Sequence, residues 1–455
     1  MWQRLLQIKA QLLAHEGFRR YGANTAWLMG EKILRMFIGL FVGIWIARYL
    51  GPEQFGLLSY AQSFVFLFTA VATLGLDSIV VRELVRDQSQ RDVLLGTAFA
   101  LKFAGSIVIL PLLWVGVQFT SNDSYTNLLI FIIASATIFQ SFNVIDFYYQ
   151  STVMSKYVAF ANTITLAISS LVKIYLILSQ ASLLAFALVG VFDALILALG
   201  MIYFYIFKTN HSLKSWRFDR NVAKYLFSDS WPLIIGSTAS AIYMNIDQIM
   251  IKEFSGNINV GYYAVAVKLS TIWTFITVTI VSSLSPHFTK VFLEDERFFN
   301  KELAKIYGVL VKISFCIALI TFILADYIVE ILYGNLYKES VKLVKMYVWI
   351  IILIFLSNAS WLYYINKSLS KIASYRLIIG AIVNIFLNLL LIPLYSIEGA
   401  IISTIISSFI SSYLINIFFD DTRNNFWLQT QALKDIFVIK SWYLSYYIRG
   451  SNDNK

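Results

Sequence analysis

The sequence predicts an all-α polytopic membrane protein with about 12 transmembrane helices, arranged as two six-helix lobes around a central cavity. Composition is the first observation: 58% of the 455 residues are hydrophobic and only 14% are charged, whereas soluble domains average about 25% charged residues. Second, the uncharged runs 55–76 and 103–122 each reach the roughly 20 residues that cross a bilayer as a helix. Third, features of the first two predicted spans recur roughly two hundred residues later.

Composition also limits the chemistry that the chain can support. The long runs are apolar on all sides, which disfavours β-barrel strands, where apolar and polar residues alternate over about 10 residues. A single cysteine, Cys316, excludes an internal disulfide framework. The three histidines lie outside the apolar runs and leave little material for a zinc site. No phosphate-loop or dinucleotide motif occurs either, so we expect no metal and no cofactor.

The chain divides into five segments. Residues 1–23 carry leucines at helical spacing beside Arg4 and Lys9, which predicts an amphipathic helix on the cytoplasmic surface. An N-lobe (24–207) and a C-lobe (230–419) follow, joined by a basic cytoplasmic linker (208–229), and a polar cytoplasmic tail (420–455) ends the chain. The predicted spans are 27–50, 55–81, 93–118, 127–150, 157–178 and 183–207 in the N-lobe, and 230–251, 261–285, 306–325, 341–364, 374–392 and 397–419 in the C-lobe.

The distribution of lysine and arginine predicts the orientation. With the N-terminus inside, the inner segments hold 25 of these residues, including Arg376 at the mouth of span 374–392. The outer connections hold three, Arg48, Lys252 and Lys338. This asymmetry matches the positive-inside rule and places both termini in the cytoplasm. The net charge of +10 is therefore mostly topological, and we expect no nucleic-acid partner.

An internal repeat relates the two lobes. Trp27 and Trp231 are 204 residues apart, as are Arg48 and Lys252, and the next glycines, Gly56 and Gly261, are 205 apart. With six spans between equivalent positions, both halves enter the membrane in the same direction. Parallel repeats of this kind are a recurrent plan in transporters, with the substrate site between the halves.

Six cationic side chains fall inside the predicted spans, away from the outer edge of span 341–364. A charge at the bilayer centre costs about 2.5–3.5 kcal/mol on insertion scales, so these side chains are not expected to face lipid. Snorkelling to the interface suffices for Lys32 and accounts for Lys312; for Arg35 and Lys102 it remains an open alternative. Arg35 shares a helix face with glycines, while Phe37 and Trp45 lie elsewhere, which is the pattern of a lined cavity. The six residues are Lys32, Arg35, Lys102, Lys173, Lys268 and Lys312.

Acidic side chains are fewer inside the spans. Glu31 precedes Arg35 by one helical turn, so the two side chains can neutralise each other. Asp193 lies in the middle of its span, and Asp247 lies near the outer end of span 230–251. Each of these two could bind a coupling cation or proton, or pair with a lysine; pairing is the favoured interpretation.

Two hairpins resemble a known family. The segment "NTAWLMGEKILRMFIGLFVGIWIARYLGPEQFGLLSYAQSFVFLF" is similar to the first hairpin of polysaccharide-export flippases of the MOP (multidrug/oligosaccharidyl-lipid/polysaccharide) superfamily, and "ARYLGPEQFG" (47–56) is its most specific part. "NIDQIMI" followed by "GYYAVAVKLS" looks like the start of the family's second half. The resemblance covers about residues 24–419, and the second hairpin departs from it because Lys252-Glu253 replaces Gly-Pro.

The resemblance implies a V-shaped pair of lobes with alternating access. Such a protein moves an undecaprenyl-diphosphate-linked oligosaccharide, an O-antigen or capsular or exopolysaccharide repeat unit, from the inner to the outer leaflet of the bacterial cytoplasmic (inner) membrane. A low-dielectric cavity would strengthen the attraction of cationic groups for the diphosphate. The candidate substrate-binding residues are Arg35, Arg48, Lys102, Lys173, Lys268 and Lys312, and Glu31, Asp193 and Asp247 are candidates for a coupling ion or for charge pairs. A polysaccharide polymerase and the chain-length machinery are candidate partners.

Two other functions remain as alternatives. A cation-coupled drug or metabolite antiporter of the same superfamily carries substrates that are often cationic, which a set of positive charges would repel. A membrane glycosyltransferase or polymerase usually needs a sizeable outer loop with acids, and the first outer loop offers only Glu53. The sequence therefore favours a transporter over an enzyme.

Overall fold

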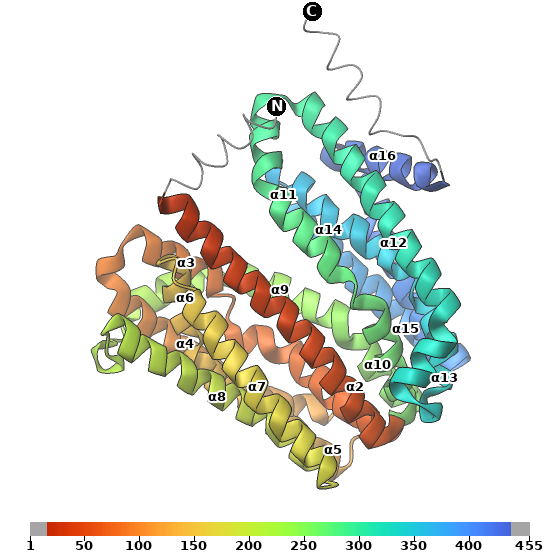
Figure 1. Ribbon diagram of the computed structural model, residues 1–455, viewed down its shortest axis with the longest axis horizontal. Coiled ribbons are helices and arrows are strands. Elements are labelled where there is room, and N and C mark those ends of the chain that lie inside the picture. The colour runs from red at the N-terminus through yellow and green to blue at the C-terminus, as the bar shows by residue number, and fades with distance from the viewer. Residues whose placement is uncertain (1–15, 438–455) are drawn as a thin grey trace, which may run out of the picture. The chain divides into compact units, whose positions relative to one another are not determined.

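The computed structural model describes residues 16–437, and the chain is helical throughout this range, with no strand in it (Figure 1). Most of the predicted amphipathic segment 1–23 and the last part of the predicted tail lie outside the described residues. The helices up to residue 255 are α2 (Glu16–Thr73), α3 (Asp77–Arg86), α4 (Arg91–Val117), α5 (Ser124–Gln140), α6 (Val144–Ser151), α7 (Lys156–Leu178), α8 (Leu183–Thr209) and α9 (Arg220–Ser255).

The second half continues in the same manner. Its helices are α10 (Asn257–Thr271), α11 (Thr274–Glu294), α12 (Glu296–Tyr333), α13 (Glu339–Tyr347), α14 (Ile350–Asn366), α15 (Ser370–Ser412) and α16 (Asp420–Lys434). Short 3-10 turns connect several of them: η1 (Gln88–Gln90), η2 (Ser141–Asn143), η3 (Leu213–Ser215), η4 (Asn335–Tyr337), η5 (Leu414–Ile417) and η6 (Asp435–Phe437).

The expectation of an all-helical membrane protein is confirmed. Eight helices in the described range are long and apolar enough to cross a membrane, or nine when the bent pair α13 and α14 counts as one span. This count is lower than the predicted twelve because α2 and α15 each carry two predicted spans across a kink, at Gly51 and at Ser396. In addition, α9, which carries predicted span 230–251, is not among the eight helices. Polar residues such as Asn245 and Asp247 lie within this predicted span.

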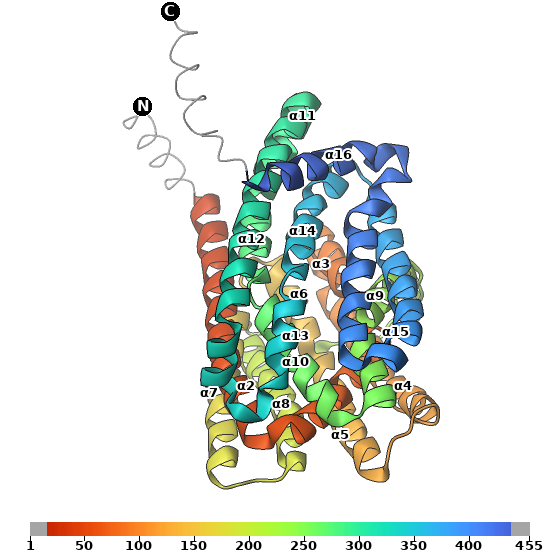
Figure 2. The same cartoon turned by 90° about the vertical axis from the view of Figure 1, so that its right-hand side faces the viewer.

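The contacts group the chain into two compact units. Among the described residues, unit 1 comprises 16–264, 329–338 and 388–397, and unit 2 comprises 265–328, 339–387 and 398–437. Unit 1 is built around α2, which packs against α4, α7 and α9, while α8 packs against α5 and α7. Its core includes the fully buried side chains of Leu76, Tyr149 and Tyr205. In unit 2, α11 packs against α14, and α16 lies across the ends of α14 and α15 (Figure 2).

The two hairpins that show the repeat have the same backbone break. Gly51 has φ 70° and ψ 172°, and Gly256, 205 residues later, has φ 86° and ψ 173°. Only glycine adopts this positive-φ region without strain. The sequence predicts the first break from Gly-Pro; the second occurs at the same relative position although Gly-Pro is missing there.

Close backbone packing joins these hairpins inside unit 1. A Cβ atom on Gly56 would lie 1.9 Å from the carbonyl oxygen of Asn257, and one on Gly261 would lie 2.1 Å from that of Pro52. Both distances are far below van der Waals contact, so only glycine fits at either position. The two contacts exchange under the 205-residue offset, because Pro52 corresponds to Asn257 and Gly56 to Gly261.

Candidate functional site

Arg35 lies on the first half of α2, one turn after Glu31. Its Nε donates to Glu31 Oε1 at 2.6 Å, and Nη2 contacts the same oxygen. The Glu31 side chain is buried, whereas that of Arg35 is 49% exposed. Phe37 and Trp45 are also exposed. At 100° per residue Phe37 lies on the side of α2 opposite Arg35, whereas Trp45 lies only about 80° from Arg35 around the helix. This part of α2 therefore exposes both a cation and aromatic side chains.

Lys102 is the most deeply buried of the predicted cations. It lies on α4 with 4% of its surface exposed, and Nζ is 3.4 Å from Asp77 Oδ1 at the start of α3. Nζ also lies 4.8 Å from the centre of the Phe147 ring, a cation–π distance. The lysine thus has one carboxylate and one aromatic face as partners.

Lys173 pairs with an acid that the sequence singled out. Its Nζ, on α7, donates to Asp193 Oδ2 on α8 at 3.0 Å and to Ser169 Oγ at 2.6 Å. Both charged side chains are about a quarter exposed. The pairing that the sequence favours for Asp193 is therefore present in the structure.

Arg48 is occupied by backbone contacts at the end of the first hairpin. Its Nη1 donates to the carbonyl oxygen of Ile331 at 3.2 Å, and next to it Tyr337 Oη donates to the carbonyl oxygen of Ala47 at 2.7 Å. Arg48 therefore fastens the hairpin to segment 329–338 of unit 1, apart from the other predicted cations.

Lys252, the counterpart of Arg48 in the repeat, also fastens a loop. Its Nζ donates to Asn122 Oδ1 at 2.6 Å and to Glu253 Oε1 at 3.0 Å, and it lies over the Tyr60 ring. Glu253 in turn accepts from the backbone N–H of Ser121. The sequence treats Lys252 as an outer-loop residue, but it is 9% exposed because Asn122 and Tyr60, both distant in the sequence, cover it.

Lys268 and Lys312 belong to unit 2, on α10 and α12, and both are partly buried. In unit 1, Arg35, Lys102 and Lys173 each form an ion pair with a different acid.

Asp247 is held by donors from two other helices. Tyr263 Oη on α10 donates to Oδ2 at 2.6 Å, and Asn388 Nδ2 on α15 donates to Oδ1 at 2.6 Å. Asp247 is 4% exposed and Asn388 is fully buried. Asn388 is not among the residues predicted from the sequence, although two asparagines one turn apart in an apolar span, Asn384 and Asn388, indicate a buried polar site.

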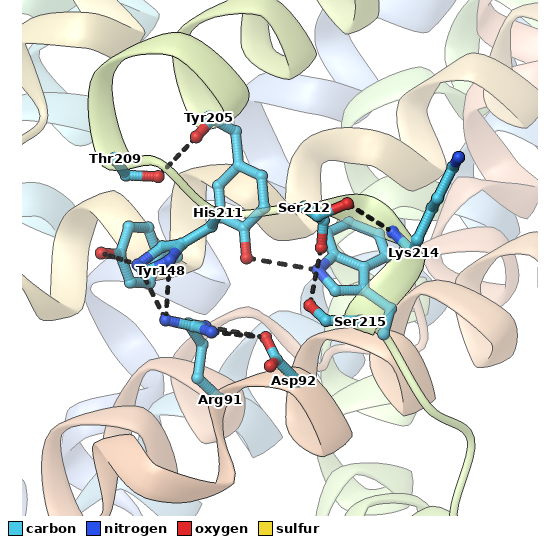
Figure 3. Close-up of polar contacts among 10 residues, drawn as sticks. Arg91, Asp92, Tyr148, Tyr205, Thr209, His211, Ser212, Lys214 and Ser215 are labelled. Atoms are coloured by element: carbon cyan, nitrogen blue, oxygen red, sulfur yellow. Dashed lines mark hydrogen bonds and ion pairs between the residues drawn. The ribbon is translucent and has the colours of Figure 1, made fainter.

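The linker is docked on unit 1 at the end where α4 begins. His211 lies 2.7 Å through Nε2 from Arg91 Nη1 and 3.1 Å from Tyr148 Oη, while Trp216 Nε1 donates to Tyr205 Oη (Figure 3). Burial and the neighbouring Arg91 charge lower the pKa of His211 below its usual value. Gly96 allows the approach, since a Cβ there would lie 2.6 Å from the backbone nitrogen of Arg217.

Arg376 is buried, although its position in the sequence predicts a residue of the inner side. On α15 it is only 7% exposed. Its guanidinium lies over the Tyr364 ring, 4.9 Å from the ring centre, and Nη2 donates to Ser357 Oγ at 2.9 Å. All three residues belong to unit 2.

Several solved structures share the fold of this chain. An inward-facing multidrug resistance MATE family transporter of the MOP superfamily matches with a TM-score of 0.70 and 11% identity, over 89% of this chain and 96% of that one. The lipid II flippase MurJ, in an inward closed conformation, matches with a TM-score of 0.65 and 16% identity, over 91% and 92%. A MATE protein in complex with MaD3S matches with a TM-score of 0.61 and 12% identity, over 93% and 98%. These TM-scores show a common fold.

Sequence comparison identifies the family. No curated protein matches the sequence, but the model of a family described as "Polysaccharide biosynthesis protein" matches residues 21–292, more than half of the chain. The chain therefore belongs to the polysaccharide biosynthesis protein family, and it has the fold of the MOP superfamily, to which MATE transporters and the flippase MurJ belong.

Proposed function

We propose that this protein is a flippase that translocates an undecaprenyl-diphosphate-linked oligosaccharide from the inner to the outer leaflet of the bacterial cytoplasmic membrane by alternating access. The observation that carries the proposal is the family match, together with a fold in common with a lipid II flippase. The cargo would be a repeat unit of O-antigen, as in lipopolysaccharide biosynthesis, or of a capsular polysaccharide or exopolysaccharide. Residues 24–207 and 230–419 would form the moving lobes, and both termini would lie in the cytoplasm.

The charge pairs of unit 1 fit an anionic cargo. A cation inside a membrane is less costly when a carboxylate accompanies it, and Arg35, Lys102 and Lys173 each have one. A diphosphate can take the place of that carboxylate, because it offers more charge and more acceptor oxygens. Arg35 is the best placed of the three, since half of its side chain is exposed and Glu31 engages only one edge of the guanidinium. Lys268 and Lys312 would extend the cationic set into unit 2.

The antiporter alternative has one observation in its favour. Asp247 is a buried acid next to amide and hydroxyl groups, which is a suitable setting for a coupling proton or sodium ion, and one matching structure is a multidrug transporter. The same aspartate could equally drive a flippase. Because the family match is to polysaccharide biosynthesis, we rank the antiporter second and a glycosyltransferase or polymerase third. A polymerase and the chain-length machinery remain proposed partners rather than activities of this chain.

The test is a pair of matched arginine variants. Arg35→Gln should block the appearance of lipid-linked sugar in the outer leaflet and cause undecaprenyl-linked repeat units to accumulate, while the amount of protein stays unchanged. Arg423→Gln is the control, because Arg423 is 55% exposed and has an acid, Asp420, one turn away, but lies outside every predicted span. Lys268→Gln tests unit 2 in the same assay. Normal flipping in both Arg35→Gln and Lys268→Gln would contradict the assignment of these two residues to a substrate-binding cavity.

A further inference from the structure

Three cationic side chains are buried in the described part of the chain, and one of them differs from the others. Lys102 and Lys252 lie 3.4 Å and 3.0 Å from a carboxylate oxygen. Arg376 is as deeply buried, yet between residues 16 and 437 it forms no ion pair. A buried charge without a counter-charge is among the most destabilising arrangements in a folded protein.

The hydrogen bonds of Arg376 are also incomplete. Nη2 donates to Ser357 Oγ at 2.9 Å and approaches the Ser357 carbonyl oxygen at 3.5 Å. Nε and Nη1 are both sealed from solvent and have no acceptor among the described residues. A guanidinium has five N–H donors, and those on two of its three nitrogens are therefore unused. An arginine in this state has both charge and directed donors available for a ligand.

The surroundings of Arg376 favour an anion. The Tyr364 ring stacks on the guanidinium, and its Oη donates to Asn416 Oδ1 at 2.5 Å. Asn416 also contacts Asn425 and Gln429 of α16, and both of these reach Ser360 Oγ. This network consists of hydroxyl and amide groups from α14, η5 and α16 and contains no carboxylate. It therefore places no negative charge beside the guanidinium that would compete with an oxyanion.

We propose that Arg376 is an oxyanion-binding residue of unit 2 and that its ligand carries a phosphate group. The planar guanidinium suits phosphate oxygens, because parallel N–H groups can engage two of them at once. The guanidinium is enclosed in this conformation, so binding requires α15 and its neighbours to separate. The phosphate could belong to a polyprenyl diphosphate or be a free anion. The first source rests on the proposed function, whereas the second does not.

The test measures binding without transport. Purified full-length protein is heated with inorganic diphosphate or with undecaprenyl diphosphate, and its melting temperature is compared for wild type, Arg376→Met and, as control, Arg423→Met. Ligand at about a hundred times its Kd should raise the melting temperature of wild type and of Arg423→Met by several degrees. Arg376→Met should show no rise. Without ligand, Arg376→Met should be at least as stable as wild type, because the substitution removes an unpaired charge.

The outcomes separate the two sources of phosphate. A rise with undecaprenyl diphosphate alone assigns a lipid-linked cargo, and a rise with both probes assigns a general oxyanion site. No rise in wild type with either probe, or an equal rise in Arg376→Met, overturns the proposal. If Arg376→Met fails to fold, Arg376→Lys is the second variant. Lysine keeps the positive charge but lacks the parallel N–H groups of the guanidinium, so we expect a Kd for the phosphate ligand at least about tenfold weaker than in wild type. Because flipping is not measured, failure of the proposed function in the Arg35→Gln assay leaves this result interpretable.

Discussion

Gly56 and Gly261 occupy equivalent positions in the two repeats, and each lies against the backbone of the other repeat's hairpin. Gly56 meets Asn257 and Gly261 meets Pro52, so the contacts are reciprocal under an offset of 205 residues. Reciprocal contacts of this kind characterise a twofold axis. The two hairpins of the sequence repeat are therefore related by a local twofold axis within one chain.

Substituting either glycine should be strongly destabilising. In Gly56→Ala or Gly261→Ala the new methyl group would lie about 2 Å from a backbone carbonyl oxygen, so the hairpins must separate. We expect a melting temperature lower by several degrees, consistent with a loss of about 2–3 kcal/mol for an overpacked contact.

Gly190→Ala on α8 is the control for this prediction. No atom lies within 4 Å of a Cβ at that position, and alanine is favoured over glycine in a helix by about 0.5–1 kcal/mol. Equal melting temperatures for Gly56→Ala and Gly190→Ala would contradict the close packing.

Variants of the Lys173–Asp193 pair can distinguish a structural role of Lys173 from a role in transport. Lys173→Met leaves Asp193 without its cation and should lower stability, whereas Lys173→Met with Asp193→Asn should recover most of the loss. The double-mutant cycle should give a coupling of about 1 kcal/mol for this partly exposed pair. Flipping should fail in both Lys173→Met backgrounds and persist in Asp193→Asn alone. Recovery of flipping in the double variant would mean that the lysine only balances the aspartate.

Asp247→Asn probes the buried carboxylate on α9. Tyr263 and Asn388 donate to different oxygens of Asp247, and asparagine replaces one of these oxygens with an NH2 group that donates, so one of the two hydrogen bonds is lost in the present geometry. We expect a loss of about 1–3 kcal/mol, and, if Asp247 carries a coupling ion, transport should lose its dependence on the proton or sodium gradient. Tyr263→Phe removes one donor but keeps the charge, so it should retain that dependence. An unchanged gradient response in Asp247→Asn would leave the aspartate with a structural role only.

Docking of the linker should depend on pH through His211. The pKa of His211 is lowered in the folded chain, so the unfolded chain binds more protons between that pKa and about 6.5. The stabilisation is therefore present above about pH 6.5 and is lost as the pH falls. Arg91 on α4 and Tyr148 on α6 face the ring, and protonation would place two cations side by side.

Hydrogen exchange of residues 209–219 measures this effect directly. Exchange should accelerate between pH 7 and pH 5.5 beyond its intrinsic pH dependence in the wild type and not in His211→Asn. Identical profiles for the two proteins would exclude His211 as the titrating group.

Much of the fold could be predicted because span length, apolar composition and loop charge are local properties. The Gly51-Pro52 pair predicts the helix break at Gly51, whereas the break at Gly256 has no proline beside it and is harder to predict from the sequence. Residues whose environment depends on distant partners were harder to judge. Lys252 looked like an outer-loop charge, but Asn122 encloses it, and Arg376 looked like a residue of the inner edge until helix packing buried it. The burial of such a residue depends on side chains from other helices, and the sequence around the residue itself does not indicate them.

The position of α16 has a practical consequence for shortened versions of the protein. Asn425 and Gln429 from this helix bond to Ser360, and Asn425 also accepts from Tyr307, inside the core of unit 2. Ending the chain before Asp420 would leave these groups facing an empty space and expose the apolar surface beneath them. A fluorescent or affinity fusion therefore belongs after residue 437, and proteolytic removal of α16 should cause aggregation rather than yield a trimmed, active transporter.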